Sequence, residues 1–216
     1  MLQIKHFEFN PFQENTYVLY DETRACVIID PGCSNKQEED QLKKFIADNN
    51  LSVTQLINTH CHIDHVLGNA FVKRTFGVKL FIHKIEEPLL RAVKTYAPNY
   101  GFFGYQEAEP DGFISEDDVL QVGNETLKIL FVPGHSPGHV AFHHEQSQSL
   151  IGGDVLFYNS IGRTDLPGGD YDTLINSIHQ KIFTLPDEVT VYCGHGPVTK
   201  IGYEKRTNPF CAIIQA

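Results

Sequence analysis

The pattern of hydrophobic and polar positions along the chain predicts a series of short strands. Residues 4–9, IKHFEF, alternate between apolar and polar side chains, which is typical of a strand with one buried face. Residues 25–30, ACVIID, form an apolar run that leads into Asp30-Pro31-Gly32, a turn signal. These two patterns predict strands at 3–9, 16–20, 25–30, 53–59, 78–83, 126–132, 138–143, 148–152 and 189–194.

Helical patterns lie between several of these strands. The segment 36–49 predicts an amphipathic helix with Leu42, Phe45 and Ile46 on its apolar face. Further helices are predicted at 65–76 and 84–97 and from Asp170, a capping residue, to about Phe183. Strands and helices alternate in the first half of the chain, and strand pairs dominate the middle. A mixed α/β (α+β) fold is therefore predicted, and without an internal repeat or linker we expect one domain over 1–216.

The segment 98–117, PNYGFFGYQEAEPDGFISED, interrupts this regularity. It predicts a loop over 98–118, and long loops inside a compact domain are usually functional or mobile. Its aromatic side chains are Tyr100, Phe102, Phe103 and Tyr105. They could cover a site as a lid, pack a dimer interface or form a small satellite core, and the sequence leaves all three possibilities open.

Composition and charge argue against several classes of function. The chain has 17 lysines and arginines against 27 aspartates and glutamates, a formal charge of −10. This charge argues against binding to nucleic acid or to an anionic membrane. The five cysteines include no CxxC pair, so we interpret them as reduced thiols, with Cys61 pointing into the core. Because we also find no signal peptide and no apolar run of membrane-spanning length, a cytoplasmic protein is expected.

The closest cluster of metal-ligating residue types lies in Thr59–Leu67, THCHIDHVL. Histidine and carboxylate side chains are ligands of Zn²⁺ and of similar metals. This stretch follows a predicted strand and leads into a predicted helix, so a short loop can turn several side chains to one side. Its candidate ligands are His60, His62, Asp64 and His65. Three of them would serve one metal, and four suggest two.

Three more candidates follow predicted strands later in the chain: His135, Asp154 and His195. Taken singly, each is better explained by a structural role, but their order and placement favour metal ligation. A carboxylate can bridge two metals, which makes Asp154 a candidate shared ligand. Asp30 is either a plain turn residue or a partner that orients a ligand histidine. We expect His139, close to His135, to make a structural hydrogen bond.

The HCHIDH motif, with the later histidine, aspartate and histidine in order, resembles the metallo-β-lactamase superfamily. The resemblance implies a four-layer αββα sandwich of two mixed sheets with the metals at one edge. It also implies two divalent metal ions, Zn²⁺ above all, with iron or manganese as possible substitutes. By this resemblance, metal one is held by His60, His62 and His135. Metal two is held by Asp64, His65 and His195, and Asp154 bridges.

Two further segments, GGDVLFYNSIGRTDLPGGD and GHGPVTKIGYEKRTNPF, resemble the glyoxalase II-like branch, the hydroxyacylglutathione hydrolases. Glyoxalase II adds a helical C-terminal domain, and because this chain ends soon after Asn208-Pro209 we expect the short, single-domain form. Candidate residues for binding the substrate's polar groups lie in these segments: Arg163, Tyr203, Lys205 and Arg206.

The reaction implied is hydrolysis of S-(2-hydroxyacyl)glutathione or a similar small-molecule thioester. Two metals lower the pKa of a shared water toward about 7, and the resulting hydroxide attacks the carbonyl. Asp64 and Asp154 are the catalytic candidates. One alternative is a persulfide dioxygenase-like enzyme with one iron, and another is a non-catalytic metal-binding protein. A secreted β-lactamase is disfavoured because we find no signal peptide. The expected assembly is a monomer or a homodimer.

Overall fold

The computed structural model describes residues 1–213, which divide into two compact units. Unit 1 comprises residues 1–114 and 121–126, and unit 2 comprises residues 115–120 and the chain from 127 onward. In the part of the chain described, no helix has both the length and the apolar character needed to cross a membrane.

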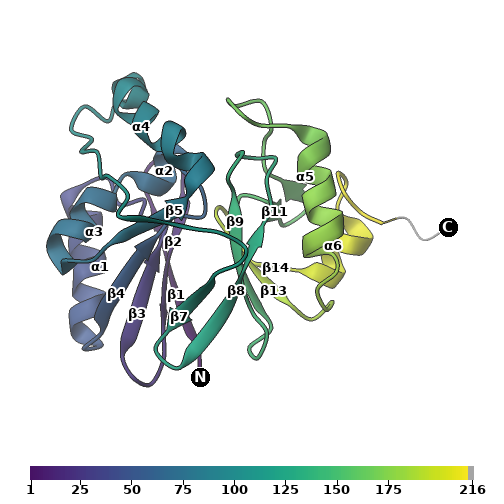
Figure 1. Ribbon diagram of the computed structural model, residues 1–216, viewed down its shortest axis with the longest axis horizontal. Coiled ribbons are helices and arrows are strands. Elements are labelled where there is room, and N and C mark those ends of the chain that lie inside the picture. Colours follow the sequence, from purple (N-terminus) through teal and green to yellow (C-terminus); the bar gives the residue numbers. More distant parts are fainter. Residues whose placement is uncertain (214–216) are drawn as a thin grey trace. The chain divides into compact units, whose positions relative to one another are not determined.

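Unit 1 is built on a six-stranded mixed sheet (Figure 1). Its strands follow the chain in the order β1 (Gln3–Phe9), β2 (Glu14–Tyr20), β3 (Ala25–Ile29), β4 (Ser52–Ile57), β5 (Leu80–His83) and β6 (Gly112–Ile114). The first three are antiparallel, and β3 to β6 are parallel. Because parallel strands end at the same edge of a sheet, the residues after β3 and after β4 lie at one edge.

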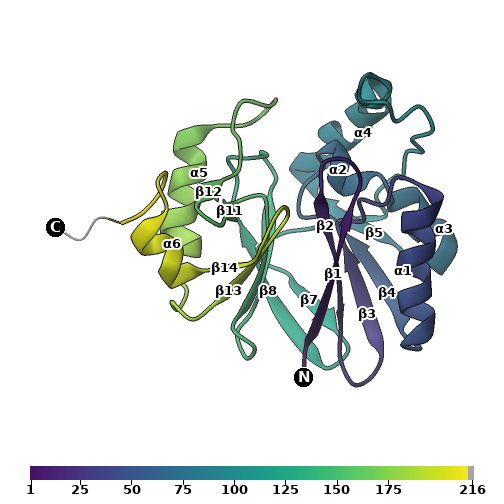
Figure 2. The same cartoon turned by 180° about the vertical axis from the view of Figure 1, so that it is seen from behind.

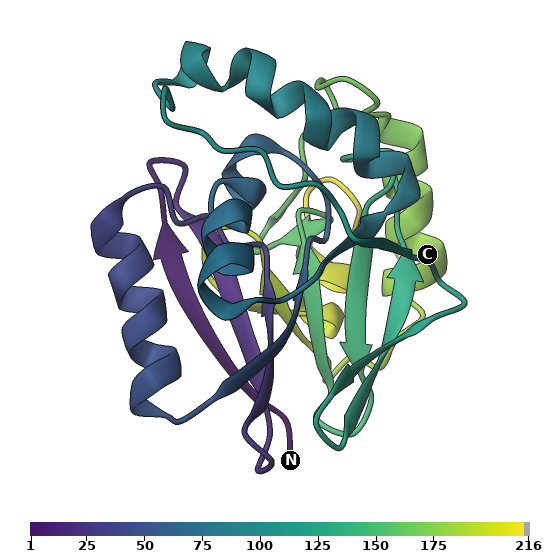
Figure 3. The ribbon, with the colours of Figure 1, turned by 60° about the vertical axis from the view of Figure 1, so that its left-hand side comes forward.

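Helices cover one face of this sheet. They are α1 (Lys36–Asp48), α2 (Ile63–Val66), α3 (Asn69–Phe76) and α4 (Glu87–Tyr96), with 3₁₀ turns η1 (Lys84–Glu86) and η2 (Ala97–Tyr100). Asn35 caps α1 by accepting a hydrogen bond from the Glu38 amide. Figure 3 shows α1 and α3 alongside the strands, and Leu42 and Val72 belong to the same buried cluster as Ile28 and Leu56.

Most of the second mixed sheet lies in unit 2, whereas the turn between its first two strands along the chain, with the adjoining strand ends (121–126), belongs to unit 1. The strand order of this sheet is β14 (Thr199–Lys200), β13 (Thr190–Cys193), β10 (Ser149–Gly153), β9 (Val140–His144), β8 (Glu125–Phe131) and β7 (Val119–Val122). β10 and β13 are parallel, whereas β8, β9 and β10 are antiparallel neighbours. A small ribbon, β11 (Leu156–Phe157) with β12 (Ser160–Ile161), follows β10.

The helices of unit 2 are α5 (Tyr171–Ser177), continued by a π-helical turn η3 (Ile178–Ile182), and α6 (Ile201–Thr207). Figure 2 shows them beside β13 and β14. Leu174, Ile178 and Ile201 pack in one buried cluster with Leu150 and Val191. The predicted cap is confirmed, because the Asp170 side chain accepts a 2.8 Å hydrogen bond from the Thr173 amide.

Some predicted elements are corrected. The helix predicted at 65–76 is two helices, separated at Leu67 and Gly68. Gly68 explains the break, because its amide donates to the Pro31 carbonyl at 2.7 Å and a Cβ there would collide with the Cys33 sulfur. The predicted loop 98–118 overlaps η2 and contains β6, which pairs with β5. Five short elements were not predicted, because a few residues carry too little periodicity: β7, β11, β12, β14 and α6.

Candidate metal centre

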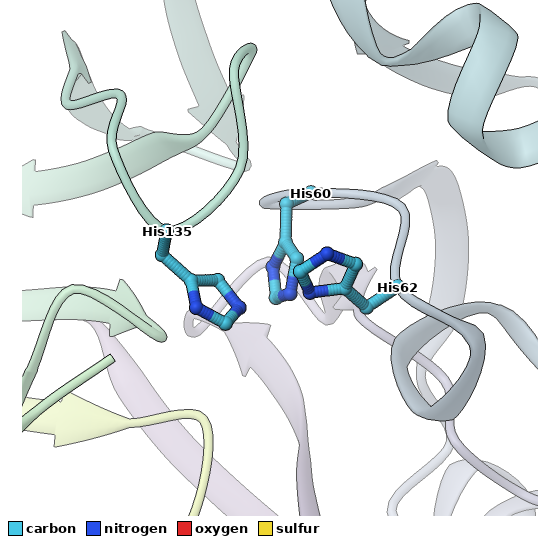
Figure 4. A group of neighbouring side chains, drawn as sticks. All are labelled: His60, His62 and His135. Atoms are coloured by element: carbon cyan, nitrogen blue, oxygen red, sulfur yellow. The ribbon is translucent and has the colours of Figure 1, made fainter. Parts of the chain in front are cut away.

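The histidine-rich loop of unit 1 follows β4 and runs into α2. The ring centroids of His60 and His62 lie 4.7 Å apart, and those of His60 and His65 lie 4.2 Å apart. Nδ1 of His60 lies 3.0 Å from the Thr59 hydroxyl. Figure 4 shows His60 and His62 on this loop, and His135 on the loop after β8. The loop after β4 therefore gathers three imidazoles in one small volume.

Asp30, at the end of β3, organises this loop from the neighbouring strand. Its carboxylate accepts hydrogen bonds from the Thr59 amide at 2.7 Å and the Thr59 hydroxyl at 2.6 Å. Oδ2 of Asp30 also lies 3.1 Å from Nδ1 of His65. Because a carboxylate accepts, Nδ1 carries the proton and Nε2 of His65 carries the lone pair that a metal needs.

The ligand-type atoms of unit 1 lie close together, although the Asp30 carboxylate is occupied by Thr59 and His65. Asp30, His60 and His65 each offer one ligand atom, and these atoms lie within 4.8 Å of one another. Oδ2 of Asp64 lies 3.8 Å from Nε2 of His65. Imidazole nitrogen and carboxylate oxygen suit zinc, iron and manganese alike, so the donor set fits a divalent metal without selecting one.

Two buried glutamates support the loop, and no pattern in the sequence predicts either of them. Glu86 accepts a 2.8 Å hydrogen bond from the Cys61 amide, between the two ligand-type histidines. Glu14 accepts a 2.9 Å hydrogen bond from the Thr16 hydroxyl, and its Oε1 lies 3.8 Å from Nδ1 of His65. Burial raises the pKa of Glu14 well above its usual value. Neither residue shows a local motif, because each meets the loop only through the fold.

Cys61 is not a candidate ligand, as predicted. Its side chain is fully buried in the apolar cluster of unit 1. Burial, with a smaller effect of Glu86, raises the pKa of the Cys61 thiol well above its usual value. All five cysteines are free and buried, so the prediction of unpaired thiols is confirmed.

In unit 2, a carboxylate lies between two imidazoles. Oδ2 of Asp154 lies 3.5 Å from Nε2 of His135 and 3.5 Å from Nε2 of His195. The three residues follow β8, β10 and β13. Because β10 and β13 are parallel and β8 is separated from β10 by one antiparallel strand, all three strands end at the same edge. A carboxylate oxygen between two imidazoles is suited to bridging two metals.

The orientation of His135 and Asp154, two of these candidate ligands, is set by the loops around them. Nδ1 of His135 lies 2.8 Å from the Arg163 carbonyl oxygen, so it donates and leaves Nε2 to face Asp154. The backbone at position 162 lies so close to His135 that only glycine fits there, because a Cβ at Gly162 would lie 2.9 Å from the His135 ring. His139 makes a structural hydrogen bond, as predicted, because its Nε2 accepts from the Asp154 amide at 3.0 Å.

The four candidate substrate-binding residues all have neighbours in unit 2. Arg163 makes two 2.7 Å hydrogen bonds to Asp165, and both side chains are exposed. Asp187 pairs with Lys205 at 2.7 Å and with Arg206 at 3.3 Å. The ring of Tyr203 stacks on that of Tyr158, with 5.3 Å between the ring centroids. A role for these side chains in binding substrate stays a prediction.

The aromatic residues of 98–118 divide into two kinds. Phe102 and Tyr105 pack against the buried cluster of unit 1, as in the satellite-core alternative. Tyr100 and Phe103 are 54% and 83% exposed, so they remain available for other contacts. Phe12, from the turn between β1 and β2, lies 5.9 Å from Tyr100 and 6.1 Å from Phe102 between ring centroids.

Comparison with known proteins identifies the family. Residues 9–195 match the Metallo-beta-lactamase superfamily. The chain belongs to the metallo-β-lactamase superfamily. It is 36% identical to "Hydroxyacylglutathione hydrolase GloC" of Haemophilus influenzae over 211 residues, which cover 97% of this chain and 98% of that protein.

Solved structures of this superfamily resemble the chain in fold and in sequence. The BLEG-1 B3 metallo-beta-lactamase is 36% identical with a TM-score of 0.88, covering 97% of this chain and 99% of that one. TTHA1623, in a di-iron-bound form, is 33% identical with a TM-score of 0.85, covering 95% and 99%. The predicted fold class, the metallo-β-lactamase fold with two mixed sheets and helices, is confirmed.

Membership in this superfamily, with the clusters of histidine and aspartate in both units, implies divalent metals and supports a metal-dependent hydrolase.

Proposed function

We propose that the protein is a binuclear metal-dependent thioesterase that cleaves S-(2-hydroxyacyl)glutathione or a similar thioester. The observation that carries the proposal is the carboxylate of Asp154, with His135 and His195 each 3.5 Å from the same oxygen. The name of the Haemophilus influenzae relative, a hydroxyacylglutathione hydrolase, supports the substrate class.

In this proposal the candidate ligands named above would hold a pair of metals. His60, His62 and His135 hold metal one, and Asp154 bridges. The ligands of metal two are Asp64, His65 and His195. Zinc is the proposed ion, and the di-iron form of TTHA1623 keeps iron, like manganese, as an alternative.

When bound, the metals provide a water with a lowered pKa as the nucleophile and polarise the substrate carbonyl. The chain's own residues supply the geometry. Asp30 holds the proton on Nδ1 of His65, the Arg163 carbonyl does the same for His135, and His139 fixes the Asp154 backbone. Asp64 orients the attacking water. A thiolate leaves readily, so the site needs no strong general acid.

The carboxylates of the substrate need cations. Arg163 is the first candidate, because its backbone carbonyl already contacts His135 and its exposed pairing with Asp165 is weak. Lys205 and Arg206 share Asp187 and would have to exchange it for substrate. Tyr203 adds a hydroxyl. We further propose a cytoplasmic location, a monomer or homodimer, and no nucleic-acid or membrane partner.

The first experiment measures metal content per chain in the as-isolated protein together with hydrolysis of S-lactoylglutathione. Two metals per chain with thioester turnover is the expected result. One iron per chain, with oxygen consumption on glutathione persulfide and no thioester turnover, would replace this function by the dioxygenase alternative. Full metal loading with no turnover on a broad thioester panel would indicate a non-catalytic metal protein.

The panel should include a β-lactam, because a structural neighbour is named a B3 metallo-beta-lactamase. Attack of an activated water on an amide carbonyl uses the same ligands. However, an amine is a poorer leaving group than a thiolate and requires protonation. We therefore expect β-lactam turnover far below thioester turnover, and the reverse order would favour a lactamase.

A further inference from the structure

The helix that carries Asp64 and His65 is a single turn. α2 spans Ile63–Val66, whereas isolated helices shorter than about 12 residues are marginal in water. The carbonyls at the end of a helix also lack partners within it. The geometry of two proposed metal ligands therefore depends on groups outside α2.

Asn10, in the turn between β1 and β2, supplies one such group. Its Nδ2 donates hydrogen bonds to the Asp64 carbonyl at 3.0 Å and to the Gly32 carbonyl at 3.0 Å. Its Oδ1 accepts from the Phe12 amide at 2.9 Å, which fixes the orientation of the side-chain amide. Both amide hydrogens are therefore directed at α2 and at the loop after β3.

Asn58 plays the same part for the next residue of α2. Its Nδ2 donates to the His65 carbonyl at 3.0 Å, and its Oδ1 accepts from Asn69 at 2.8 Å. Asn58 is fully buried, whereas Asn10 is half-buried. Two asparagine amides, one in the turn after β1 and one just after β4, thus hold consecutive carbonyls of the one-turn helix. Asn10 is the one that can be changed with less risk to the core.

Asn10 is itself held firmly. Its backbone has a left-handed φ of +52°, and its backbone N–H donates a 3.0 Å hydrogen bond to the Glu38 side chain. The space beside it is closed, because a Cβ on Gly32 would lie 2.6 Å from Nδ2 of Asn10 and 2.7 Å from the Asp64 carbonyl oxygen. A displacement of Asn10 therefore has little room, and the Asp64 backbone is fixed with it.

We propose that Asn10 is a positioning residue for the metal centre. It fixes the backbone of Asp64 and hence the direction in which that carboxylate meets a metal. The inference rests on the proposed function, in which Asp64 is a ligand. Its consequence is that removing the Asn10 amide weakens metal binding although Asn10 touches no metal.

The test uses Co²⁺ as the probe, with affinity measured by chelator competition and by the absorption spectrum of the bound ion. Asn10→Gly removes the amide and accepts the left-handed backbone. Asn10→Asp keeps the size and the acceptor for Phe12 but removes both donors. The matched control is Asn50→Gly, since Asn50 has the same φ of +52° in an exposed turn after α1.

We expect both Asn10 variants to bind Co²⁺ about tenfold more weakly, with an altered spectrum, and Asn50→Gly to match the wild type. Unchanged affinity in folded Asn10→Gly and Asn10→Asp would overturn the positioning role, even if the metal-free variants unfold at a lower temperature. If Asn10→Gly fails to fold, Asn10→Asp alone decides. Wild-type protein that binds fewer than two Co²⁺ would instead refute the proposed binuclear centre, and this inference with it.

Discussion

Nδ1 of His65 lies 3.1 Å from Oδ2 of Asp30, a residue 35 positions earlier in the chain. The same carboxylate binds the backbone and the hydroxyl of Thr59, so one side chain connects the end of β3 to the loop after β4 and to α2. This contact decides which nitrogen of His65 is protonated. We therefore expect Asp30 to influence metal affinity through His65.

We predict that Asp30→Asn lowers metal affinity by about 10- to 100-fold. Asparagine tolerates the left-handed φ of +50° found at this position. Its amide nitrogen, however, would donate to Nδ1 of His65 and move the ring proton to Nε2. Chelator competition measures the change, and Asp172→Asn, on the exposed face of α5, is the control. Equal affinity in both variants would contradict the tautomer argument.

We predict that Asp154→Ala abolishes thioester hydrolysis. The change removes the oxygen that lies 3.5 Å from two histidine nitrogens and also lowers the metal content below two per chain. Circular dichroism should report an intact fold, because the apolar cluster of unit 2 is untouched. His60→Ala should have the same effect through metal one. Asp172→Asn, an exposed aspartate of α5, is the control, and retained activity in either ligand variant would refute the mechanism.

We predict that Arg163→Ala raises KM for a carboxylate-bearing thioester about tenfold or more and changes kcat much less, since a hydrogen bond to a charged group contributes about 1.5–3 kcal/mol. Loss of the Asp165 pair should cost little stability because both side chains are exposed. Arg91→Ala, which breaks an exposed pair with Glu87 and Glu109, is the control. A KM equal to that of the control would show that Arg163 pairs with Asp165 and does not bind the substrate.

We predict that stability falls as pH rises from about 9 toward 12. Burial raises the pKa of Cys26 from 9.0 to about 12. Above pH 9 the unfolded chain loses this proton while the folded chain keeps it, so unfolding becomes more favourable by up to about 1.4 kcal/mol per pH unit and thiol. Cys193 and Cys211 are also raised to about 12 by burial.

Urea unfolding of metal-free protein at pH 8 and pH 10 measures this loss. Cys26→Ala should lose less stability between the two pH values than the wild type, because it has one fewer buried thiol. An equal loss in both proteins would show that the thiol does not contribute to the pH dependence.

Local patterns predicted most of the fold and the ligand candidates. Strand periodicity predicted the strands that precede the candidate ligands along the chain. The close spacing of the four candidates after β4 is a property of the sequence itself: His60, His62, Asp64 and His65. The cap at Asp170 was predicted for the same reason, since its partner is only three residues away. What these features share is that the interacting residues are close in the chain.

Only the tertiary structure decided how the candidates are held. The break between α2 and α3 depends on contacts of Gly68 with Pro31 and Cys33, from another strand's loop. Asn10 reaches Asp64 across 54 positions, and Glu86 reaches the Cys61 amide across 25. Such hydrogen bonds form because strand order brings distant turns to one edge of the sheet. A one-dimensional pattern carries no information about which asparagine or glutamate will reach that edge. The sequence by itself therefore determined the candidate ligands, whereas the fold determined their orientation.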